Sequence, residues 1–245
     1  MTPSPIRSAF FIAEAFLQRM PARIIRSVCW RAPAHVNGRP TIVVVEMGSD
    51  DSPPQLWRSV GHFIAGHARV NLAVVPFREA SAGTLLRCEP AAVVLTGYHQ
   101  ELSSYRFVEM EPLFGFLSCT DLPVFAICGG FQFMAMAFGS DIVEMGFEER
   151  GYAPLRLRAD DPLFDGLTAP PVVYNWHHMK ISDVPGDFRL LADNDACVQA
   201  IRHRERPLYG VQFHPEFADR RHADSAAIFG NFLAIAGLKT APQGE

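Results

Sequence analysis

The stretch LPVFAICGGFQFMAMAFG, residues 122–139, joins two kinds of secondary structure at one cysteine. The apolar run PVFAIC, residues 123–128, is typical of a buried strand, and a helical pattern opens at Gly129. Cys128 therefore falls on the tight turn between strand and helix, directly before two glycines. A turn of this kind holds a side chain above the edge of a sheet, where it is accessible for chemistry.

Strand and helix patterns alternate on both sides of this turn. Apolar runs typical of strands occupy residues 41–46, 70–77, 91–97 and 123–128, and helical spacing occupies 53–68, 106–118 and the residues after Gly129. Beyond residue 150 we expect shorter strands, in APLRLR, PVVYNW, FRLLA, CVQAIR and LYGVQFH, and then a last helix that closes on Gly237. Continuous apolar strands that alternate with helices predict an α/β fold with an open, largely parallel central sheet covered by helices on both faces.

The position of Cys128 favours a reactive thiol. The helix that begins at Gly129 points free N–H groups and the positive end of its dipole at the turn, and both favour thiolate over thiol. The same N–H groups can stabilise an oxyanion that forms when the thiolate attacks a carbonyl group. The alternative interpretation is a buried core cysteine, because free cysteine is among the most buried residue types.

A partner base lies in YGVQFHPEF, residues 209–217. Pro215 favours an extended conformation at His214, and in an extended chain Glu216 faces the same way as His214. The carboxylate can then orient the imidazole, which leaves the second ring nitrogen to exchange a proton with the thiol. Both segments end predicted strands of one sheet, and the combination predicts covalent catalysis by a cysteine, a base and an orienting carboxylate. Taken alone, the His-x-Glu pattern is also typical of a solvated strand end.

The composition excludes several classes of protein. The chain has 245 residues, of which 49% are hydrophobic and 20% charged, so it can bury a sizeable core. The formal net charge of −4 argues against a partner bound through nucleic-acid phosphates. No apolar window reaches the length of a membrane span, and we expect no membrane partner. Five scattered cysteines without a Cys-x-x-Cys pair are typical of a reducing compartment, so we expect a cytoplasmic protein.

At this point the sequence resembles the class I glutamine amidotransferase family, and the guanylate-synthase-like domain in particular. AICGGFQ (126–132) resembles the family's nucleophile turn, Gly-x-Cys-x-Gly-x-Gln, and YGVQFHPEF (209–217) resembles its Gly-x-Gln-x-His-Pro-Glu signature. AAVVLTGYHQ (91–100) is similar to the strand that carries the family's oxyanion turn. The resemblance covers roughly residues 41–236 and implies a flavodoxin-like, three-layer α/β/α fold.

The resemblance also implies roles for individual residues. Cys128 would attack the side-chain amide of glutamine, His214 would act as base and then as acid, and Glu216 would orient His214. The backbone N–H groups of Gly97 and Gly129 would form the oxyanion hole. Water would then release glutamate from the thioester. No cofactor is expected.

Four residues are predicted to bind the substrate. Gln132 would contact the bound glutamine, as the glutamine of the nucleophile turn does in the family, and Tyr98 follows the oxyanion turn. His177 and His178 fall in a stretch that borders the glutamine pocket in relatives. We expect no metal at these two histidines, because no third ligand lies nearby in the sequence.

The chain is predicted to have three parts. Residues 1–40 form an extension with an amphipathic helix over roughly 8–28, residues 41–238 form the amidotransferase-like domain, and 239–245 form a disordered tail. The extension is expected to pack on this domain or on a partner.

Three functions are open from the sequence. The first is a free-standing amidotransferase that hydrolyses glutamine and supplies ammonia to a separate synthetase. The second uses the same three residues to hydrolyse or transfer the γ-glutamyl group of a metabolite or peptide. The third is a non-catalytic scaffold with the same fold.

Overall fold

A computed structural model describes residues 34–48, 56–167 and 170–240 of the chain. The predicted helix over 8–28 lies outside these residues, as does most of the predicted tail, although Thr240 forms an isolated β-bridge with Ala68. Among the described residues, no helix has both the length and the apolar character that a membrane span requires.

Ten strands and five α-helices follow one another along the described chain. The strands are β1 (Thr41–Glu46), β2 (Asn71–Pro76), β3 (Pro90–Leu95), β4 (Val124–Ile127), β5 (Ile142–Pro154), β6 (Arg156–Leu157), β7 (Val172–Ile181), β8 (Phe188–Asp193), β9 (Val198–His203) and β10 (Leu208–Val211). The α-helices are α3 (Trp57–His67), α4 (Ala82–Leu86), α5 (Glu111–Cys119), α6 (Gly129–Ala137) and α7 (Asp224–Ile235). Short 3₁₀ turns are η1 (Phe77–Glu79), η2 (Leu102–Ser104), η3 (Phe107–Met110), η4 (Pro162–Phe164) and η5 (Pro215–Phe217).

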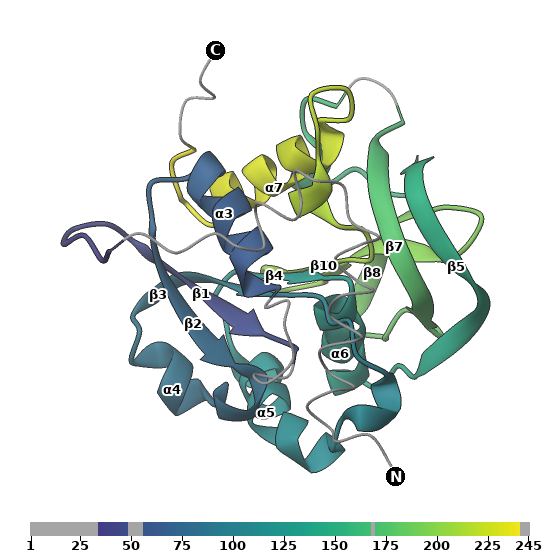
Figure 1. Ribbon diagram of the computed structural model, residues 1–245. Helices are drawn as coiled ribbons and strands as arrows, with labels where there is room; N and C mark the ends of the chain where they lie inside the picture. The colour runs from purple at the N-terminus through teal and green to yellow at the C-terminus, as the bar shows by residue number, and fades with distance from the viewer. Residues whose placement is uncertain (1–33, 49–55, 168–169, 241–245) are drawn as a thin grey trace, which may run out of the picture.

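The central sheet has the order β2-β1-β3-β4-β10-β9-β8-β6. The five strands from β2 to β10 run parallel to their neighbours, whereas β9, β8 and β6 are antiparallel. Helices cover both faces of the sheet, with α3 and α7 on one side and α4, α5 and α6 on the other (Figure 1). The predicted fold class, a three-layer α/β/α structure with a largely parallel sheet, is confirmed.

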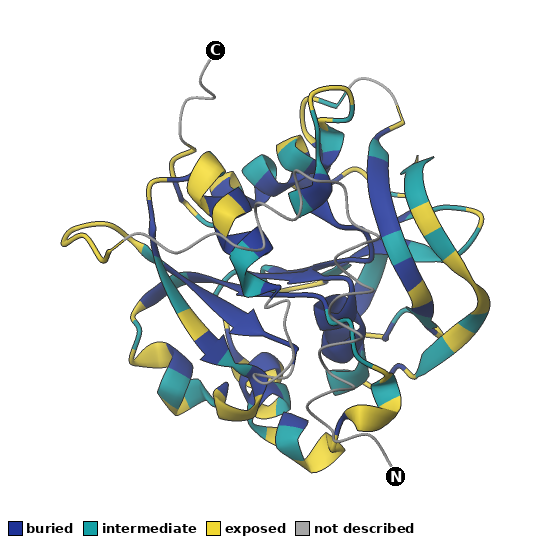
Figure 2. Ribbon diagram, viewed as in Figure 1, coloured by how far each residue is buried: buried dark blue, intermediate teal, exposed yellow. Residues whose placement is uncertain are grey.

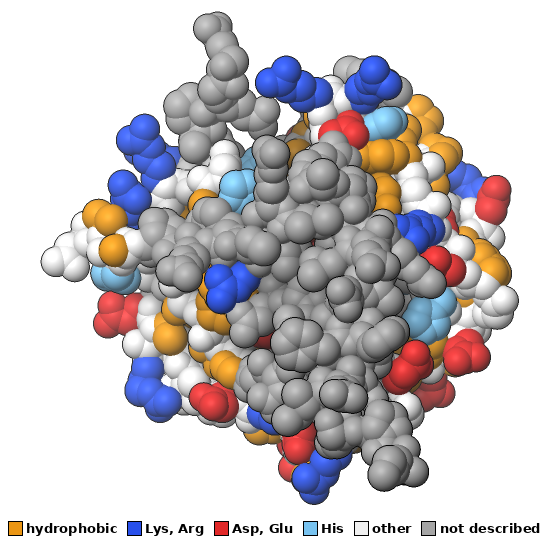
Figure 3. All heavy atoms as spheres, viewed as in Figure 1, with side chains coloured by type: hydrophobic (Ala, Val, Ile, Leu, Met, Phe, Trp, Pro, Cys, Tyr) orange, Lys and Arg blue, Asp and Glu red, His pale blue; other side chains and the backbone are white. Residues whose placement is uncertain are grey.

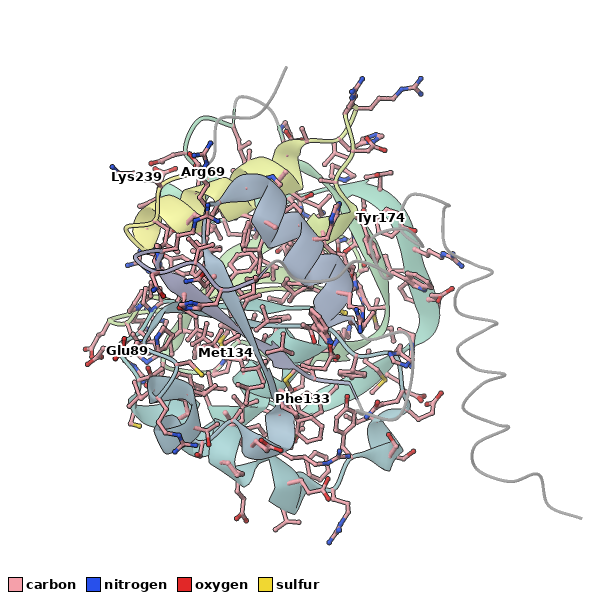
Figure 4. The ribbon with its side chains drawn as sticks, turned by 60° about the vertical axis from the view of Figure 1, so that its left-hand side comes forward. Arg69, Glu89, Phe133, Met134, Tyr174 and Lys239 are labelled. Carbon is pink, nitrogen blue, oxygen red and sulfur yellow. The ribbon has the colours of Figure 1, made fainter. Side chains whose placement is uncertain are left out.

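The strand β1 shows why the sheet needs a layer of helices on each face. Ile42 and Val44 pack into the apolar cluster beneath α3 and α7, whereas Val43 and Val45 pack into the cluster beneath α5 and α6. All four side chains are wholly buried, and the central strands are dark along their length in Figure 2. A strand buried on both faces has no polar side, so its sequence is a continuous apolar run instead of an alternating one. Phe133 and Met134 of α6 fill the second cluster (Figure 4).

A second, two-stranded antiparallel sheet is made by β5 and β7. The prediction of short strands beyond residue 150 is wrong for this pair, because β5 has 13 residues and β7 has 10. The strand β5 mixes apolar residues with four charged ones and has glycines at 146 and 151, and its register with β7 shifts between Glu144 and Glu149. Neither strand periodicity nor a continuous apolar run is therefore visible in its sequence.

The surface carries charges of both signs. On the face shown in Figure 3, basic and acidic side chains are interspersed and form no single patch. This distribution fits the small net charge of the chain, −4.

Candidate active site

Cys128 lies in a strained turn between β4 and α6. Its backbone has φ 49° and ψ −109°, and among the described non-glycine residues only Glu89 shares a positive φ. Such a conformation costs about 1–3 kcal/mol and persists only where the surrounding structure enforces it. Here the N–H of Cys128 donates to the carbonyl of Val211 at 2.8 Å, which fixes the turn to the end of β10.

The two glycines after Cys128 are required by close packing. A Cβ atom on Gly129 would lie 1.9 Å from Cδ1 of Tyr98, because the tyrosine ring lies against the turn. A Cβ atom on Gly130 would lie 2.6 Å from the carbonyl oxygen of Thr96, which accepts the N–H of Gly130 at 3.0 Å. The start of α6 is thus pressed against the end of β3, and only glycine fits there.

His214 and Glu216 follow β10, the strand next to β4. The Nδ1–H of His214 donates to Oε1 of Glu216 at 2.8 Å, and both side chains are nearly inaccessible to solvent, at 8% and 3% exposure. The N–H of His214 donates to the carbonyl of Tyr174 on β7 at 2.8 Å, and the imidazole stacks on Phe217 with ring centroids 5.0 Å apart. Tyr174 is labelled in Figure 4.

The local geometry at this histidine differs in part from the prediction. The strand β10 ends at Val211 and not at His214, and Glu216 lies in the 3₁₀ turn η5. His214 itself is extended, with φ −106° and ψ 93°, as predicted from the following proline. The two side chains therefore meet because the chain turns after His214, and not because residues i and i+2 of a strand share a face.

Three chain segments converge at the turn. Since β4 and β10 are adjacent and parallel, with Ile127 opposite Val211, the residues that follow them lie at the same edge of the sheet. Gly97, which follows β3, lies between them: a Cβ atom there would be 3.3 Å from Cε1 of His214 and 4.0 Å from Sγ of Cys128. The thiol of Cys128, the imidazole of His214 and the backbone of Gly97 can thus all contact the same small chemical group of a bound molecule.

The electrostatic environment favours a protonated imidazole at His214. Burial by itself lowers the pKa of His214, but the charges of Glu216 and Cys128 outweigh it and hold this pKa well above its ordinary value of 6.5. Burial also raises the pKa of Tyr98, so its hydroxyl group stays protonated at neutral pH. The site can therefore hold an imidazolium next to a thiolate, which is an activated nucleophile with a proton donor beside it.

A pocket of about 370 Å³ opens in front of Cys128. It is lined by Leu56, Tyr98, His99, Gln100, Cys128, Gln132, Glu148, Trp176, His177, His178, Met179, His214 and Phe217. All four residues predicted to bind the substrate are among them. The volume is in the range of small-molecule sites.

The predicted substrate-binding residues differ in how they face this pocket. Gln132 is 1% exposed, and its side chain accepts from the Tyr98 hydroxyl at 2.8 Å and donates to the Met179 carbonyl at 2.8 Å. Gln132 thus holds two walls of the pocket together. His178 is exposed, whereas His177 is buried and its Nδ1–H donates to the Met179 carbonyl at 3.2 Å.

Two further residues contribute to the site and were not predicted. Nε2 of Gln212 lies 3.6 Å from Sγ of Cys128 and donates to it, and Gln212 is wholly buried. The sequence feature that could have identified Gln212 is its position two residues before His214 in YGVQFH. Trp176 lines the pocket and donates from its indole to Glu148 at 2.9 Å. No pattern in the sequence distinguishes it from a core aromatic residue.

Comparison with known proteins gives a family and a set of relatives. The sequence model described as "Glutamine amidotransferase class-I" matches residues 63–235. The chain is 33% identical over 121 residues to a subunit of the glutamine-hydrolyzing GMP synthase of Archaeoglobus fulgidus, and the match covers 49% of this chain and 65% of that protein. It is 36% identical over 118 residues to the corresponding subunit from Pyrococcus furiosus, covering 48% and 62%. The matches thus span just under two thirds of the length of these relatives.

Solved structures with the same fold support this relationship. A putative GMP synthase subunit from Thermoplasma acidophilum superposes with a TM-score of 0.64 at 26% identity, over 83% of this chain and 96% of that one. A glutamine amidotransferase from Thermotoga maritima superposes with a TM-score of 0.63 at 17% identity, over 82% and 99%, which is a likeness of fold alone.

Proposed function

The chain belongs to the class I glutamine amidotransferase family, and we propose that it hydrolyses the side-chain amide of glutamine through a cysteinyl thioester and supplies the ammonia to a separate synthetase. One observation carries the proposal. The strained turn of Cys128 and the buried pair of His214 and Glu216, whose Nδ1 and Oε1 atoms are 2.8 Å apart, follow two adjacent parallel strands and meet at one edge of the sheet. The relatives are named as one subunit of a synthase, which favours a separate synthetase as the partner.

The first half of the proposed reaction forms the thioester. The thiolate of Cys128 attacks the amide carbon of glutamine, and the negative charge moves to the carbonyl oxygen. The backbone N–H groups of Gly97 and Gly129 are assigned to this oxyanion, because Gly97 packs against Cys128 and the N–H of Gly129 is the first of α6. His214 then donates its proton to the amide nitrogen, the C–N bond breaks, and ammonia leaves.

The second half releases glutamate. The now neutral His214 takes a proton from a water molecule, and the resulting hydroxide attacks the thioester carbon. The C–S bond breaks, glutamate leaves, and the imidazolium–thiolate pair is restored. Glu216 holds the imidazole in one orientation through both steps, since its carboxylate accepts the Nδ1–H. Glutamine and water enter, and glutamate and ammonia leave.

The proposal also assigns the walls of the substrate pocket, the bounds of the catalytic domain and the cytoplasm as the cellular compartment. Gln132 and Tyr98 would shape the substrate pocket through their mutual hydrogen bond, and His177 and His178 would border it. We assign the amidotransferase domain to residues 41–238 and treat 1–40 as an extension. The described cysteines are free, in keeping with activity in the cytoplasm.

The test is the release of ammonia and glutamate from L-glutamine by the full chain. Cys128→Ala should abolish it, whereas Cys119→Ala should not, because Cys119 is exposed at the end of α5, outside the pocket. The synthetase component of a GMP synthase should raise the rate if it is the partner.

Two outcomes would favour the other functions. Cys128-dependent hydrolysis of larger γ-glutamyl amides, with no release from glutamine, would favour a stand-alone γ-glutamyl hydrolase or transferase. A folded protein that acts on neither substrate, with or without a synthetase, would favour a non-catalytic scaffold.

A further inference from the structure

A second group of chemically reactive side chains lies behind the pocket wall. One ligand atom from each of Glu149, His177 and Cys197 lies within 4.8 Å of the others. Glu149 and His177 are directly opposite each other on β5 and β7, and Cys197 precedes β9 of the central sheet. The proposed hydrolysis uses the chemistry of none of the three.

The side chains of His177 and Glu149 bring two potential metal-binding atoms together. The Nδ1 atom of His177 lies 3.2 Å from the Met179 carbonyl, which can only accept, so Nδ1 carries a proton and Nε2 is the ring atom that remains for a ligand. This Nε2 lies 3.1 Å from Oε2 of Glu149 and is buried without a hydrogen-bond partner, because the two atoms are not aligned for one. A metal cation between Nε2 of His177 and Oε2 of Glu149 would attract both atoms.

The surrounding residues hold the potential ligands in place. Asn194 donates to the other carboxylate oxygen of Glu149, Oε1, at 2.6 Å, and its own side-chain carbonyl accepts the N–H of Cys197 at 3.0 Å. Nε2 of Gln199 lies 3.4 Å from both Oε2 of Glu149 and Sγ of Cys197. Gln199 is wholly buried, and its Oε1 has no hydrogen-bond partner.

We propose that Glu149, His177 and Cys197 bind a zinc ion, with water as the fourth ligand, or with Gln199 Oε1 after the amide of Gln199 turns over. Thiolate, imidazole and carboxylate are the three ligand types that zinc accepts, and a histidine whose other nitrogen donates to a backbone carbonyl is the usual ligand arrangement. One thiolate, one carboxylate and a neutral imidazole balance the charge of Zn²⁺, so the buried site is neutral. On binding, the Cys197 thiol releases its proton to solvent.

The site would join the two sheets. Its ligands come from β5, β7 and the residue before β9, so zinc would clamp the two-stranded sheet onto the central one. The present spread of up to 4.8 Å must shrink by roughly an ångström to match zinc–ligand bonds of about 2.0–2.3 Å. From the sequence we expected no metal at His177 and His178, because no third ligand lies nearby in the chain. The fold instead brings Glu149 and Cys197 to His177 from distant segments. This role for His177 is independent of the proposed function, in which His177 borders the substrate pocket.

Cobalt and zinc titrations of the full chain test the site. The Cys128→Ala protein is used, so that the catalytic thiol contributes no signal. Co²⁺ should bind one to one with a thiolate-to-metal charge-transfer band, one equivalent of Zn²⁺ should displace it, and Zn²⁺ should raise the melting temperature. Absence of the charge-transfer band would overturn the proposal.

Matched variants locate the ligands. Cys197→Ser and His177→Gln should each weaken Co²⁺ and Zn²⁺ binding by at least about 10-fold, by analogy with losses seen when residues around a metal are changed. Cys88→Ser and His178→Gln should bind like the parent protein, because neither side chain belongs to the cluster. Circular dichroism checks that each variant folds. An undiminished charge-transfer band in Cys197→Ser would place the metal elsewhere and refute the assignment.

Discussion

At the scale of single residues, the site depends on the charge that Glu216 places beside His214. Burial opposes the protonation of this imidazole, and the nearby negative charges outweigh burial and raise its pKa well above 6.5. We therefore expect the imidazolium–thiolate pair, and with it the activity, to persist into the alkaline range. Activity should fall only as the pH rises through the raised pKa of His214.

Glu216→Gln should move this alkaline limb to lower pH. The substitution removes one of the charges that raise the pKa of His214 while leaving burial, which lowers it. The pH profile of kcat for glutamine hydrolysis measures the shift, and kcat itself should fall by roughly 10²-fold, as for other losses in acid–base catalysis. Glu111→Gln, at an exposed position on α5, is the control and should leave the profile in place.

The stability of the protein should follow the same titration. A group whose pKa is higher in the folded state stabilises the fold fully below its unfolded pKa, about 6.5 for histidine, and loses this contribution as the pH rises through the folded pKa. Thermal melts from neutral to alkaline pH should show the loss at lower pH in Glu216→Gln than in the parent. Identical curves would contradict the assigned coupling.

The sequence predicted the residues of the turn better than their surroundings. Cys128 and His214 were identifiable because each lies in a short local pattern, an apolar strand before Gly-Gly and an extended residue before proline. The side chains behind the pocket wall were not, because Glu149 and Cys197 come from segments without distinctive neighbours. Only the pairing of β5 with β7 and the hydrogen bonds from Asn194 and Gln199 to Glu149 bring them together.

At the scale of elements, the start of α6 is held against β3 by Gly130. A methyl group there would lie 2.6 Å from the Thr96 carbonyl and 2.7 Å from Cβ of Leu95, and both belong to or follow a central strand that cannot move freely. We expect Gly130→Ala to lower the free energy of unfolding by about 1–3 kcal/mol, the cost of overpacking. Chemical denaturation measures it.

A glycine in another helix gives the matched control. Gly230 lies inside α7, and a Cβ atom there would meet nothing within 4 Å. Gly230→Ala should therefore raise the free energy of unfolding by about 0.5–1 kcal/mol, because alanine is the better helix former. Equal effects of the two substitutions would show that the approach of α6 to β3 is not the constraint.

The elements themselves were predictable to different degrees. The strands from β1 to β4 were predicted within one or two residues, because burial on both faces makes them continuous apolar runs. The strand β5 was missed before Ala153, since its mixture of charged, apolar and glycine residues and its shift in register remove the period that identifies a strand.

At the scale of the whole molecule, Asp161 links the antiparallel half of the central sheet to the turn η4. Its side chain is wholly buried, accepts from Arg202 at 3.0 Å and pairs with Arg189, and it caps η4 by accepting the N–H of Leu163 at 3.0 Å. Removing one partner of a buried pair costs about 3–5 kcal/mol when both groups are fully buried. The two arginine side chains keep 35% and 27% exposure, so a smaller loss is expected.

Asp161→Asn should lower the free energy of unfolding by about 2–3 kcal/mol, a buried-pair loss reduced for solvent screening. Asp193→Asn is the comparison, because Asp193 also pairs with two arginines, Arg156 and Arg158, but near the surface, where their side chains are 50% and 47% exposed. We expect about 0–1 kcal/mol there. Urea denaturation measures the free energy of unfolding of both variants. A larger decrease for Asp193→Asn than for Asp161→Asn would contradict the proposed importance of burial.

The order of strands in the central sheet has a consequence for the biosynthesis of the enzyme. The last of the described strands, β10, lies between β4 and β9, so it enters the middle of a sheet whose other members precede it in the chain. Translation delivers the N-terminal segments first, and Cys128 therefore leaves the ribosome well before His214. An unfinished chain holds its thiol without a base and leaves one edge of β4 open. Under the proposed function, ammonia release therefore requires that translation has passed His214, and a chain that stops before β10 should release none.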